Sequence, residues 1–412
     1  MQEKKDILFL CQFFYPEYIS SATLPFDTAK ALSESGMNVG VLCGFPNEYN
    51  NNGKVPLTDK YEEIEIKRLK YIQMKRSNIL GRLINYLSFT VSVLLNLKEI
   101  KKYKLLIVYS NPPILPIVAA IANKLFNTEI VFVCYDIYPE IAIKTGAISE
   151  KGVISKVMNL VNTSLYKNIN KVVALSYDMK KYLLSNRNQL RENQIAVIPN
   201  WYEDQPDKDV EISYANKLFK EMYPKEKLII SYLGNMGIAQ DLNTLIDAIK
   251  FFKDNTEISF LFAGHGSKVS ELKDTVENKS LKNVFIYDFL HGTDFQDALN
   301  ISDIFIVSLE SGLEGLAVPS KTYSYMMNGK PIIAIMDKDT DISQDIVNNK
   351  AGYGIEVGDV KGLVNAIVEL NGYPAKRVMA GRNARKVYVK KHTTKKATLK
   401  YVEMMRSILE DK

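Results

Sequence analysis

The chain has 412 residues, of which 46% are apolar and 24% are charged, and its net charge is +6. This length predicts two domains of about 200 residues each, and the ordinary balance of apolar and charged residues excludes a largely disordered chain. The mild positive charge fits an anionic membrane surface or a phosphorylated substrate, and we expect no nucleic acid as a partner.

The first half of the chain alternates strand-like and helical segments. Its apolar strand-like runs are residues 6–11, 39–44, 104–110, 129–136, 171–176 and 195–200. Between the first two runs, residues 22–36 place Leu24, Thr28, Ala31 and Leu32 on one helical face, and Gly36 supplies the stop. Strands that alternate with helices in this way predict a parallel, doubly wound α/β sheet.

The three cysteines and the first residues of the chain indicate the cellular compartment in which we expect the protein. Cys11, Cys43 and Cys134 each lie in a strand-like run, where a cysteine usually serves as a small buried apolar residue. They form no disulfide framework, which favours a reducing cytoplasm. The opening residues 1–17 do not resemble a signal peptide, because their apolar run is short and no small-residue cleavage site follows.

Residues 67–104 depart from the alternating pattern. They contain a mostly apolar stretch, residues 79–97, with lysines and arginines on both sides. Three interpretations remain open: a core helix with a basic rim, an interfacial helix and a transmembrane span. Arg82, Asn85 and Asn96 argue against the span. Because basic flanks suit anionic headgroups, we expect a peripheral contact with the inner face of the cell membrane.

A polar, proline-bearing stretch at residues 199–211 predicts the domain boundary. We therefore expect an acceptor-side domain at 1–200, a donor-side domain at 201–390 and a last helix within 391–412 that packs back on the first domain. The second domain has six further strand-like runs, at residues 227–235, 257–266, 283–290, 303–309, 330–336 and 352–357. Ligands of open parallel sheets bind beyond the carboxyl ends of the strands, which predicts a cleft faced by both domains.

The segment that follows residues 303–309 has the features of an anion site. After a loop rich in glycine and glutamate, Pro319, Ser320 and Lys321 open a helix, with the serine as a possible cap. First-turn amides and the helix dipole make this position positive, and Lys321 adds a full charge. The alternative is an ordinary capped helix.

Two glycine turns belong to the same edge of the predicted sheet. Gly234 and Gly237 lie at the end of one strand-like run, and Gly264 and Gly266 lie at the end of the next. Glycine allows the backbone to approach a phosphate closely, although a purely structural turn has the same appearance. The chain has no Walker lysine loop and no dinucleotide fingerprint after its first strand, which argues against a P-loop kinase and a typical nicotinamide dehydrogenase.

The ordered set LGN.G, FAGHG, SDIFIVSL and PSK.Y.YM..GKPIIA resembles the nucleotide-binding half of family 4 retaining glycosyltransferases of the GT-B fold. In the first half, VYSNPPILPIVAAIANKL and VCYDIYPE are similar to the branch that acts on bacterial surface polysaccharides and includes N-acetylfucosaminyl transferases. The resemblance covers about residues 7–369. It implies two Rossmann-like domains and transfer of a hexosyl or N-acetylhexosaminyl group from a nucleotide donor, most often UDP-linked, to a lipid-linked or polysaccharide acceptor.

The resemblance also implies roles for individual residues. Lys321 would hold the donor diphosphate, Glu314 would lie against the transferred sugar, and Asp136 would present a polar group to the reacting sugar. The implied donor-binding residues are Gly234, Asn235, Met236, Gly237, Gly264, His265, Gly266, Tyr287, Asp288, Phe289, Glu310, Pro319, Ser320 and Ser324. The implied acceptor-binding residues are Tyr18, Ser20, Ser21 and Thr23.

Neither a metal nor another cofactor is expected. GT-B enzymes generally work without metal, and the three histidines, His265, His291 and His392, have no metal-ligand spacing. The alternating aspartates within residues 337–341 follow the anion-binding helix and are interpreted as a solvated loop.

Several positions depart from the family pattern. Ser324 stands where most members have a glutamate that grips the ribose, and Asn235 and Gln240 stand where an arginine and a lysine are common. Lys321 would then carry more of the charge on the leaving diphosphate. Arg187 and Arg191, near the end of the first domain, are candidate substitutes.

Two alternatives to an active transferase remain, and the departures motivate the first of them. The chain could be a catalytically degenerate GT-B partner subunit that binds an acceptor, or a nucleotide-sugar epimerase that needs neither lipid nor acceptor. The sequence leaves the sugar, its linkage, the acceptor and the oligomeric state open.

Overall fold

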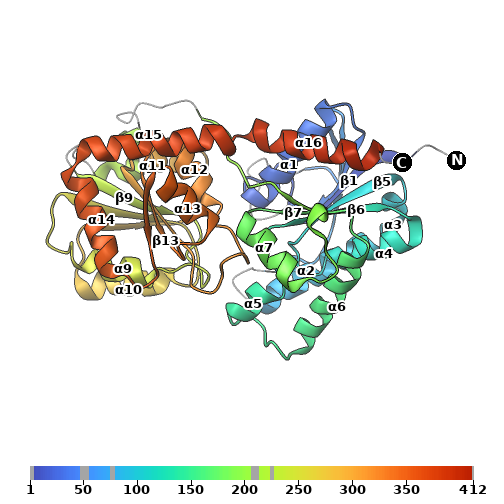
Figure 1. Cartoon of the computed structure of the whole chain (residues 1–412), viewed down its shortest axis with the longest axis horizontal. Helices are drawn as coiled ribbons and strands as arrows, with labels where there is room; N and C mark the ends of the chain where they lie inside the picture. The colour runs from blue at the N-terminus through green and yellow to red at the C-terminus, as the bar shows by residue number, and fades with distance from the viewer. Residues whose placement is uncertain (1–3, 47–54, 75–78, 206–212, 223–226, 411–412) are drawn as a thin grey trace. The chain divides into compact units, whose positions relative to one another are not determined.

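The computed structural model describes residues 4–46, 55–74, 79–205, 213–222 and 227–410. Parts of the predicted boundary (206–211), the predicted membrane segment (75–78) and the last helix (411–412) lie outside these residues. The chain forms two compact units (Figure 1). The first contains Met1–Asn200, Gly315–Val318 and Thr394–Lys412, and the second contains Trp201–Glu314 and Pro319–Thr393.

The first unit is built on an eight-stranded sheet with the order β3-β4-β2-β1-β5-β6-β7-β8. All neighbours pair in parallel except β3 and β4, which pair antiparallel. The strands are β1 Lys5–Cys11, β2 Val39–Gly44, β3 Thr58–Tyr61, β4 Ile64–Leu69, β5 Tyr103–Tyr109, β6 Glu129–Cys134, β7 Lys171–Ala174 and β8 Ile195–Val197. All six predicted strand-like runs are strands, and the predicted parallel α/β sheet is confirmed.

Helices cover both faces of this sheet, so its inner strands are buried and apolar. They are α1 Ser20–Glu34, α2 Ile79–Leu94, α3 Leu97–Ile100, α4 Pro116–Phe126, α5 Glu140–Lys144, α6 Val153–Lys167, α7 Tyr177–Asn186 and α16 Thr394–Glu410, with a 3-10 turn at Glu192–Gln194. The predicted inner face of α1 is buried at Leu24, Thr28 and Leu32. Helix α16 packs against α1, and Arg406 donates a hydrogen bond to the Ser35 carbonyl at 3.2 Å (Figure 1).

The apolar stretch 79–97 does not form one helix. Helix α2 ends at Leu94, and the short helix α3 begins at Leu97. Within the described ranges, no helix has both the length and the apolar character needed to cross a bilayer. The three cysteines are buried and free, as predicted.

The second unit has a six-stranded, fully parallel sheet with the order β11-β10-β9-β12-β13-β14. Its strands are β9 Leu228–Leu233, β10 Ile258–Ala263, β11 Val284–Tyr287, β12 Ile304–Ser308, β13 Ile332–Ile335 and β14 Gly352–Ile355. Its helices are α9 Asn243–Lys250, α10 Val269–Lys279, α11 Gly292–Ile301, α12 Lys321–Asn328, α13 Asp341–Asn348, α14 Val360–Gly372 and α15 Pro374–Lys391, with a 3-10 turn at Lys217–Met222. Each predicted strand-like run again forms a strand.

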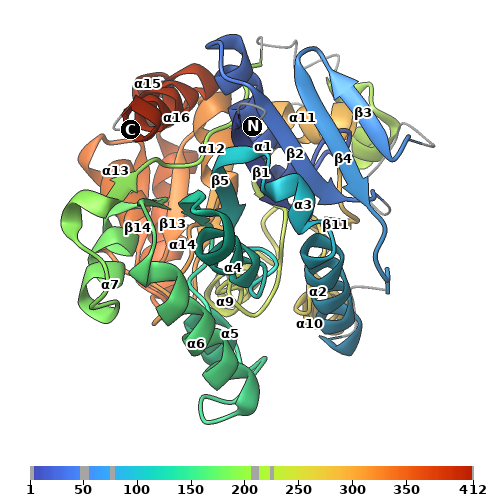
Figure 2. The same cartoon turned by 90° about the vertical axis from the view of Figure 1, so that its right-hand side faces the viewer.

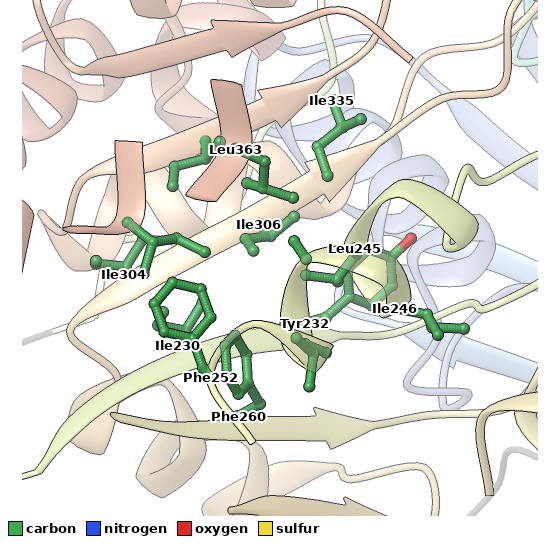
Figure 3. Close-up of a cluster of buried hydrophobic side chains, with 14 of the residues drawn as sticks. Ile230, Tyr232, Leu245, Ile246, Phe252, Phe260, Ile304, Ile306, Ile335 and Leu363 are labelled. Atoms are coloured by element: carbon green, nitrogen blue, oxygen red, sulfur yellow. The ribbon is translucent and has the colours of Figure 1, made fainter. Parts of the chain in front are cut away.

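The core of the second unit fixes the ends of its central strands. Ile230 and Tyr232 of β9 pack with Ile306 of β12 and with side chains from α9 and α14, including Leu245 and Leu363 (Figure 3). Winding proceeds from β9 to β10 and β11 on one side, then resumes at β12 on the other side of β9. The loops after β9 and β12 therefore diverge at a topological switch point, where α/β sheets bind ligands.

Candidate donor site

The loops after β9, β10 and β11 are joined by backbone hydrogen bonds beyond the strand ends. The Gly234 amide donates to the Ala263 carbonyl at 2.7 Å, and the Met236 amide donates to the His265 carbonyl at 2.8 Å. The Gly237 amide donates to the side-chain oxygen of Gln240 at 2.9 Å. The sequence suggests a glycine turn whose amides bind an anion. These three amides already have acceptors within the protein, so they are not free to donate to an anion.

The glycines at 264 and 266 are required by the contact between two loops. A Cβ at Gly264 would lie 1.9 Å from the Gly234 carbonyl oxygen, and a Cβ at Gly266 would lie 2.2 Å from the Met236 carbonyl oxygen. Gly234 itself has a φ of +113°. These turns have a structural reason for glycine that does not depend on a ligand.

Replacing Gly264 by alanine is expected to lower the free energy of unfolding by about 2–4 kcal/mol, because the backbone of one loop must move. Gly372→Ala at the end of α14 is the control, because its added Cβ meets nothing within 4 Å. Chemical denaturation of both variants measures the effect. Equal stability of the two variants would contradict the proposed packing.

Lys321 is the first residue of α12, and its side chain lies against the first glycine turn. Its Nζ donates to the Asn235 carbonyl at 3.0 Å and lies 3.7 Å from the centroid of the Tyr232 ring, a cation–π contact. The Lys321 Cε lies 3.5 Å from the position of a Cβ on Gly234. The predicted proximity of Lys321 and the glycine turn is therefore present.

The Lys321 side chain is half-buried, and its ammonium has no carboxylate partner among the described residues. Burial lowers the pKa of Lys321 well below its usual value, and no described carboxylate forms an ion pair with it. An anion beside this ammonium would favour the charged form and reverse the shift. The position therefore suits a phosphate oxygen.

The start of α12 differs in part from the prediction. The Ser320 side chain caps no amide, so the expected serine cap is wrong, because Ser320 has helical rather than extended backbone angles. The Thr322 and Tyr323 amides donate to the Pro319 and Ser320 carbonyls at 3.2 Å each. The amides of Ser320 and Lys321 have no acceptor in the described part of the chain, and they remain for an anion.

The Ser324 side chain is bonded within its own helix. Its hydroxyl donates to the Lys321 carbonyl at 2.8 Å and is buried inside the unit. In this arrangement it offers no free group to a ribose, unlike the glutamate that the resemblance places there.

Two side chains after β10 and β11 lie near each other. The rings of His265 and Phe289 are 5.1 Å apart, and burial together with the nearby Lys321 ammonium lowers the pKa of His265. Tyr287 donates its hydroxyl to the Leu218 carbonyl at 2.7 Å, so its polar end is already engaged. Asp288 is exposed next to it, and Met236 is fully buried beneath the turn.

The loop after β12 brings one carboxylate to the site. The Glu310 amide donates to the Ala239 carbonyl at 2.9 Å, and its carboxylate lies 3.5 Å from the Nζ of Lys268. Glu314 instead folds back on its own loop, where its carboxylate accepts from the Gly312 amide at 2.9 Å. Lys268 was missed from the sequence, where it appears only as a lysine just after the second glycine turn.

Asp136 belongs to the first unit and follows β6. Its amide donates to the Ser110 hydroxyl at 3.2 Å, and its backbone forms an isolated bridge with Ala317 of the same unit. Burial raises the pKa of the Asp136 carboxyl to about 6. Its charge therefore changes close to neutral pH.

The predicted acceptor residues lie at the start of α1, directly after β1, at the same sheet edge as Asp136. Ser20 and Thr23 are exposed, and Tyr18 and Ser21 are half-buried. Arg187 is not a free cation, because its Nη2 donates to both carboxylate oxygens of Glu140, at 2.7 and 2.8 Å. Arg191 is exposed near the end of the first unit's chain segment.

Comparisons with known proteins agree with this geometry. Residues 214–387 match the family model "Glycosyl transferases group 1". The chain is 24% identical over 261 residues to the probable glycosyltransferase WbjE of Pseudomonas aeruginosa. This alignment covers 63% of this chain and 64% of WbjE. The chain is also 24% identical over 194 residues to the putative colanic acid biosynthesis glycosyl transferase WcaI of Escherichia coli K12, covering 47% of each chain. The matches thus span less than two thirds of either relative.

Among solved structures, Anabaena Alr3699/HepE in complex with UDP-glucose superposes with a TM-score of 0.73 and 15% identity, over 98% of this chain and 100% of that chain. The likeness confirms the predicted GT-B fold with two Rossmann-like domains. The resemblance to group 1 glycosyltransferases is supported by the family model in the second unit.

Proposed function

We propose that this chain is a retaining, metal-independent glycosyltransferase that moves a hexosyl or N-acetylhexosaminyl group from a UDP-sugar to a lipid-linked or polysaccharide acceptor. The observation that carries the proposal is the Lys321 ammonium, which lies at a glycine turn of the switch point without a carboxylate partner in the described residues. The matched family model, the name of WcaI and the UDP-glucose bound to HepE support it. Bacterial surface-glycan synthesis is the proposed setting, within the N-acetylfucosaminyl-transferase-like branch.

The donor diphosphate would bind at the start of α12. As the bond between sugar and diphosphate breaks, negative charge grows on the leaving phosphate and positive charge grows on the sugar carbon. The Ser320 and Lys321 amides and the Lys321 ammonium are already oriented by α12, so they stabilise the leaving group without reorganisation. The carboxylates of Glu310 and Glu314 would lie against the transferred sugar, and Asp136 would present a polar group to the reacting sugar. The start of α1 would bind the acceptor.

A panel of UDP-sugars tests the proposal. The purified chain is titrated with UDP by calorimetry, then incubated with each UDP-sugar and a bacterial membrane lipid extract, and released UDP is measured. Binding of UDP and lipid-dependent release from at least one sugar are expected. Absence of both would reject the function, and an epimerised free nucleotide sugar would instead identify an epimerase.

One observation favours a second candidate, a GT-B partner subunit without catalysis. Ser324 is buried and bonded to its own helix, so the site lacks the carboxylate that the resemblance places at the ribose. For this candidate, the Lys321→Met variant would still support glycan synthesis in cells that lack the native gene. Loss of the glycan in those cells would exclude it.

We also propose that α2 contacts an anionic membrane surface. Leu80, Leu87, Val91 and Leu95 recur at helical spacing and are exposed, and Leu95 is 81% exposed. Arg82 lies within this stripe and lysines lie on both sides of it in the sequence, whereas α2 has no acidic residue. Apolar stripes with basic flanks suit the interface of a bilayer.

A second exposed apolar stripe, on α6, supports the proposed contact of the first unit with a membrane. Val153, Val157 and Leu160 of α6 are exposed at the same spacing. Helix α4 packs against both α2 and α6 and lies between them in the first unit (Figure 2). This region of the first unit therefore presents apolar residues on two helices.

The variant Leu87→Asp, Val91→Asp is expected to bind vesicles of phosphatidylcholine and phosphatidylglycerol at least about 10-fold more weakly than the wild type. Burial of each side chain is worth about 1.5–3 kcal/mol. Val368→Asp on α14, also exposed, is the matched control. Co-sedimentation measures binding, and an unchanged double variant would rule out α2 as the contact.

A further inference from the structure

Lys268 lies in the loop after β10, immediately before α10, and its side chain crosses to the loop after β9. Its Nζ donates to the Gln240 carbonyl at 2.9 Å, and its amide donates to the Met236 carbonyl at 3.0 Å. The side chain is only 15% exposed. A lysine held this closely at a strand-end edge is positioned by the fold and is not a freely solvated surface charge.

The turn from Asn235 to Gln240 is held by a lysine at each end. Lys321 donates to the carbonyl of Asn235, and Lys268 donates to the carbonyl of Gln240. The turn's own amides at Gly234, Met236 and Gly237 have acceptors within the protein. These three amides are therefore not available to an anion, and the two ammonium groups add to the amides at the start of α12 as groups that can attract one.

The contact with Glu310 leaves Lys268 able to bind a further anion. The distance from the Glu310 carboxylate to the Lys268 Nζ is 3.5 Å, longer than a good hydrogen bond, and the Glu310 side chain is 36% exposed. Of the three protons on Nζ, one is donated to the Gln240 carbonyl. The other two are available to a ligand that displaces or shares the contact with Glu310.

We propose that Lys268 is the second cation of the donor site and binds the diphosphate of the nucleotide sugar together with Lys321. This role rests on the proposed function, and it explains how a chain with Asn235 and Gln240 at its glycine turn still neutralises two phosphates. Glu310 lies beside the Lys268 ammonium and gives way to the diphosphate when the nucleotide sugar binds.

Titration calorimetry with UDP and with uridine tests this role. Lys268→Met is expected to weaken UDP at least about 10-fold and to change uridine binding less than about twofold, because only UDP carries the diphosphate. Lys268→Arg should recover most of the lost affinity. Lys273→Met, an exposed lysine on α10, is the matched control and should bind UDP like the wild type.

Glu310→Gln is expected to change UDP affinity in the opposite direction to Lys268→Met. Removing a negative charge beside Lys268 should tighten UDP binding severalfold, whereas a purely structural Lys268–Glu310 pair would leave it unchanged. The proposal is overturned if Lys268→Met weakens UDP and uridine equally, or weakens neither. Failure of the wild-type protein to bind UDP would instead reject the proposed function, and the wild-type titration shows this separately.

Discussion

Lys321→Met is expected to lower the rate of UDP-sugar turnover by about 10²–10³-fold, the loss typical of removing one positioned group that stabilises developing negative charge. The methionine keeps the length and apolar stem of the side chain, so contact with the Tyr232 ring can persist while the charge is lost. Burial already disfavours the charged form of this lysine. The fold should therefore tolerate the neutral side chain.

The pH dependence has a defined sign. Because the pKa of Lys321 is lowered, the free protein loses this positive charge at a lower pH than an ordinary lysine. UDP affinity should therefore begin to fall at a lower pH than the deprotonation of an ordinary lysine would cause, and in Lys321→Met this early part of the fall should disappear. Lys361→Met, exposed on α14, is the control. Turnover within about threefold of the wild type in Lys321→Met would contradict the assigned role.

Asp136→Asn is expected to lower turnover by a similar factor and to leave UDP affinity within about twofold, because Asp136 belongs to the other unit. The pKa of Asp136 is raised to about 6, so the carboxyl is neutral below that pH and ionised above it. If the ionised form assists the reacting sugar, wild-type turnover should rise between about pH 5 and 7. Rate measurements across this range check the prediction.

A stability measurement separates this effect from misfolding. A carboxyl whose pKa is raised by burial destabilises the folded state when it ionises, so Asp136→Asn should not lower, and can raise, the melting temperature at pH 7. Glu150→Gln, an exposed residue of the same unit, is the control. A melting temperature well below that of the wild type would mean that lost turnover reports damage to the fold.

The strands were predictable because their signal is local. Buried parallel strands such as β1 and β9 are continuous apolar runs bounded by polar residues. This pattern is recognisable from the local sequence without knowledge of the tertiary contacts. The edge strand β3 was not predicted, since its sequence TDKY is polar and only its antiparallel pairing with β4 defines it. The single helix expected at 79–97 ends early because the chain turns at Asn96.

The site was predictable where a motif fixes both residue and place, as at the glycine turn and Lys321. It was not predictable where function depends on which loops touch. Lys268 meets Gln240 only because the loops after β9 and β10 pack together, and no spacing along the sequence encodes that contact. Ser320 shows the reverse, since a favourable residue type fails to cap when its backbone angles are helical.

The return of α16 to the first unit has a consequence for biosynthesis. Tyr401 and Met405 of α16 are buried in the packing with α1, yet the ribosome adds them only after the entire second unit has been made. Until then, the nascent first unit leaves apolar surface of α1 uncovered and available to chaperones. The N-terminal half of the chain therefore completes its folding after the C-terminal half has been translated.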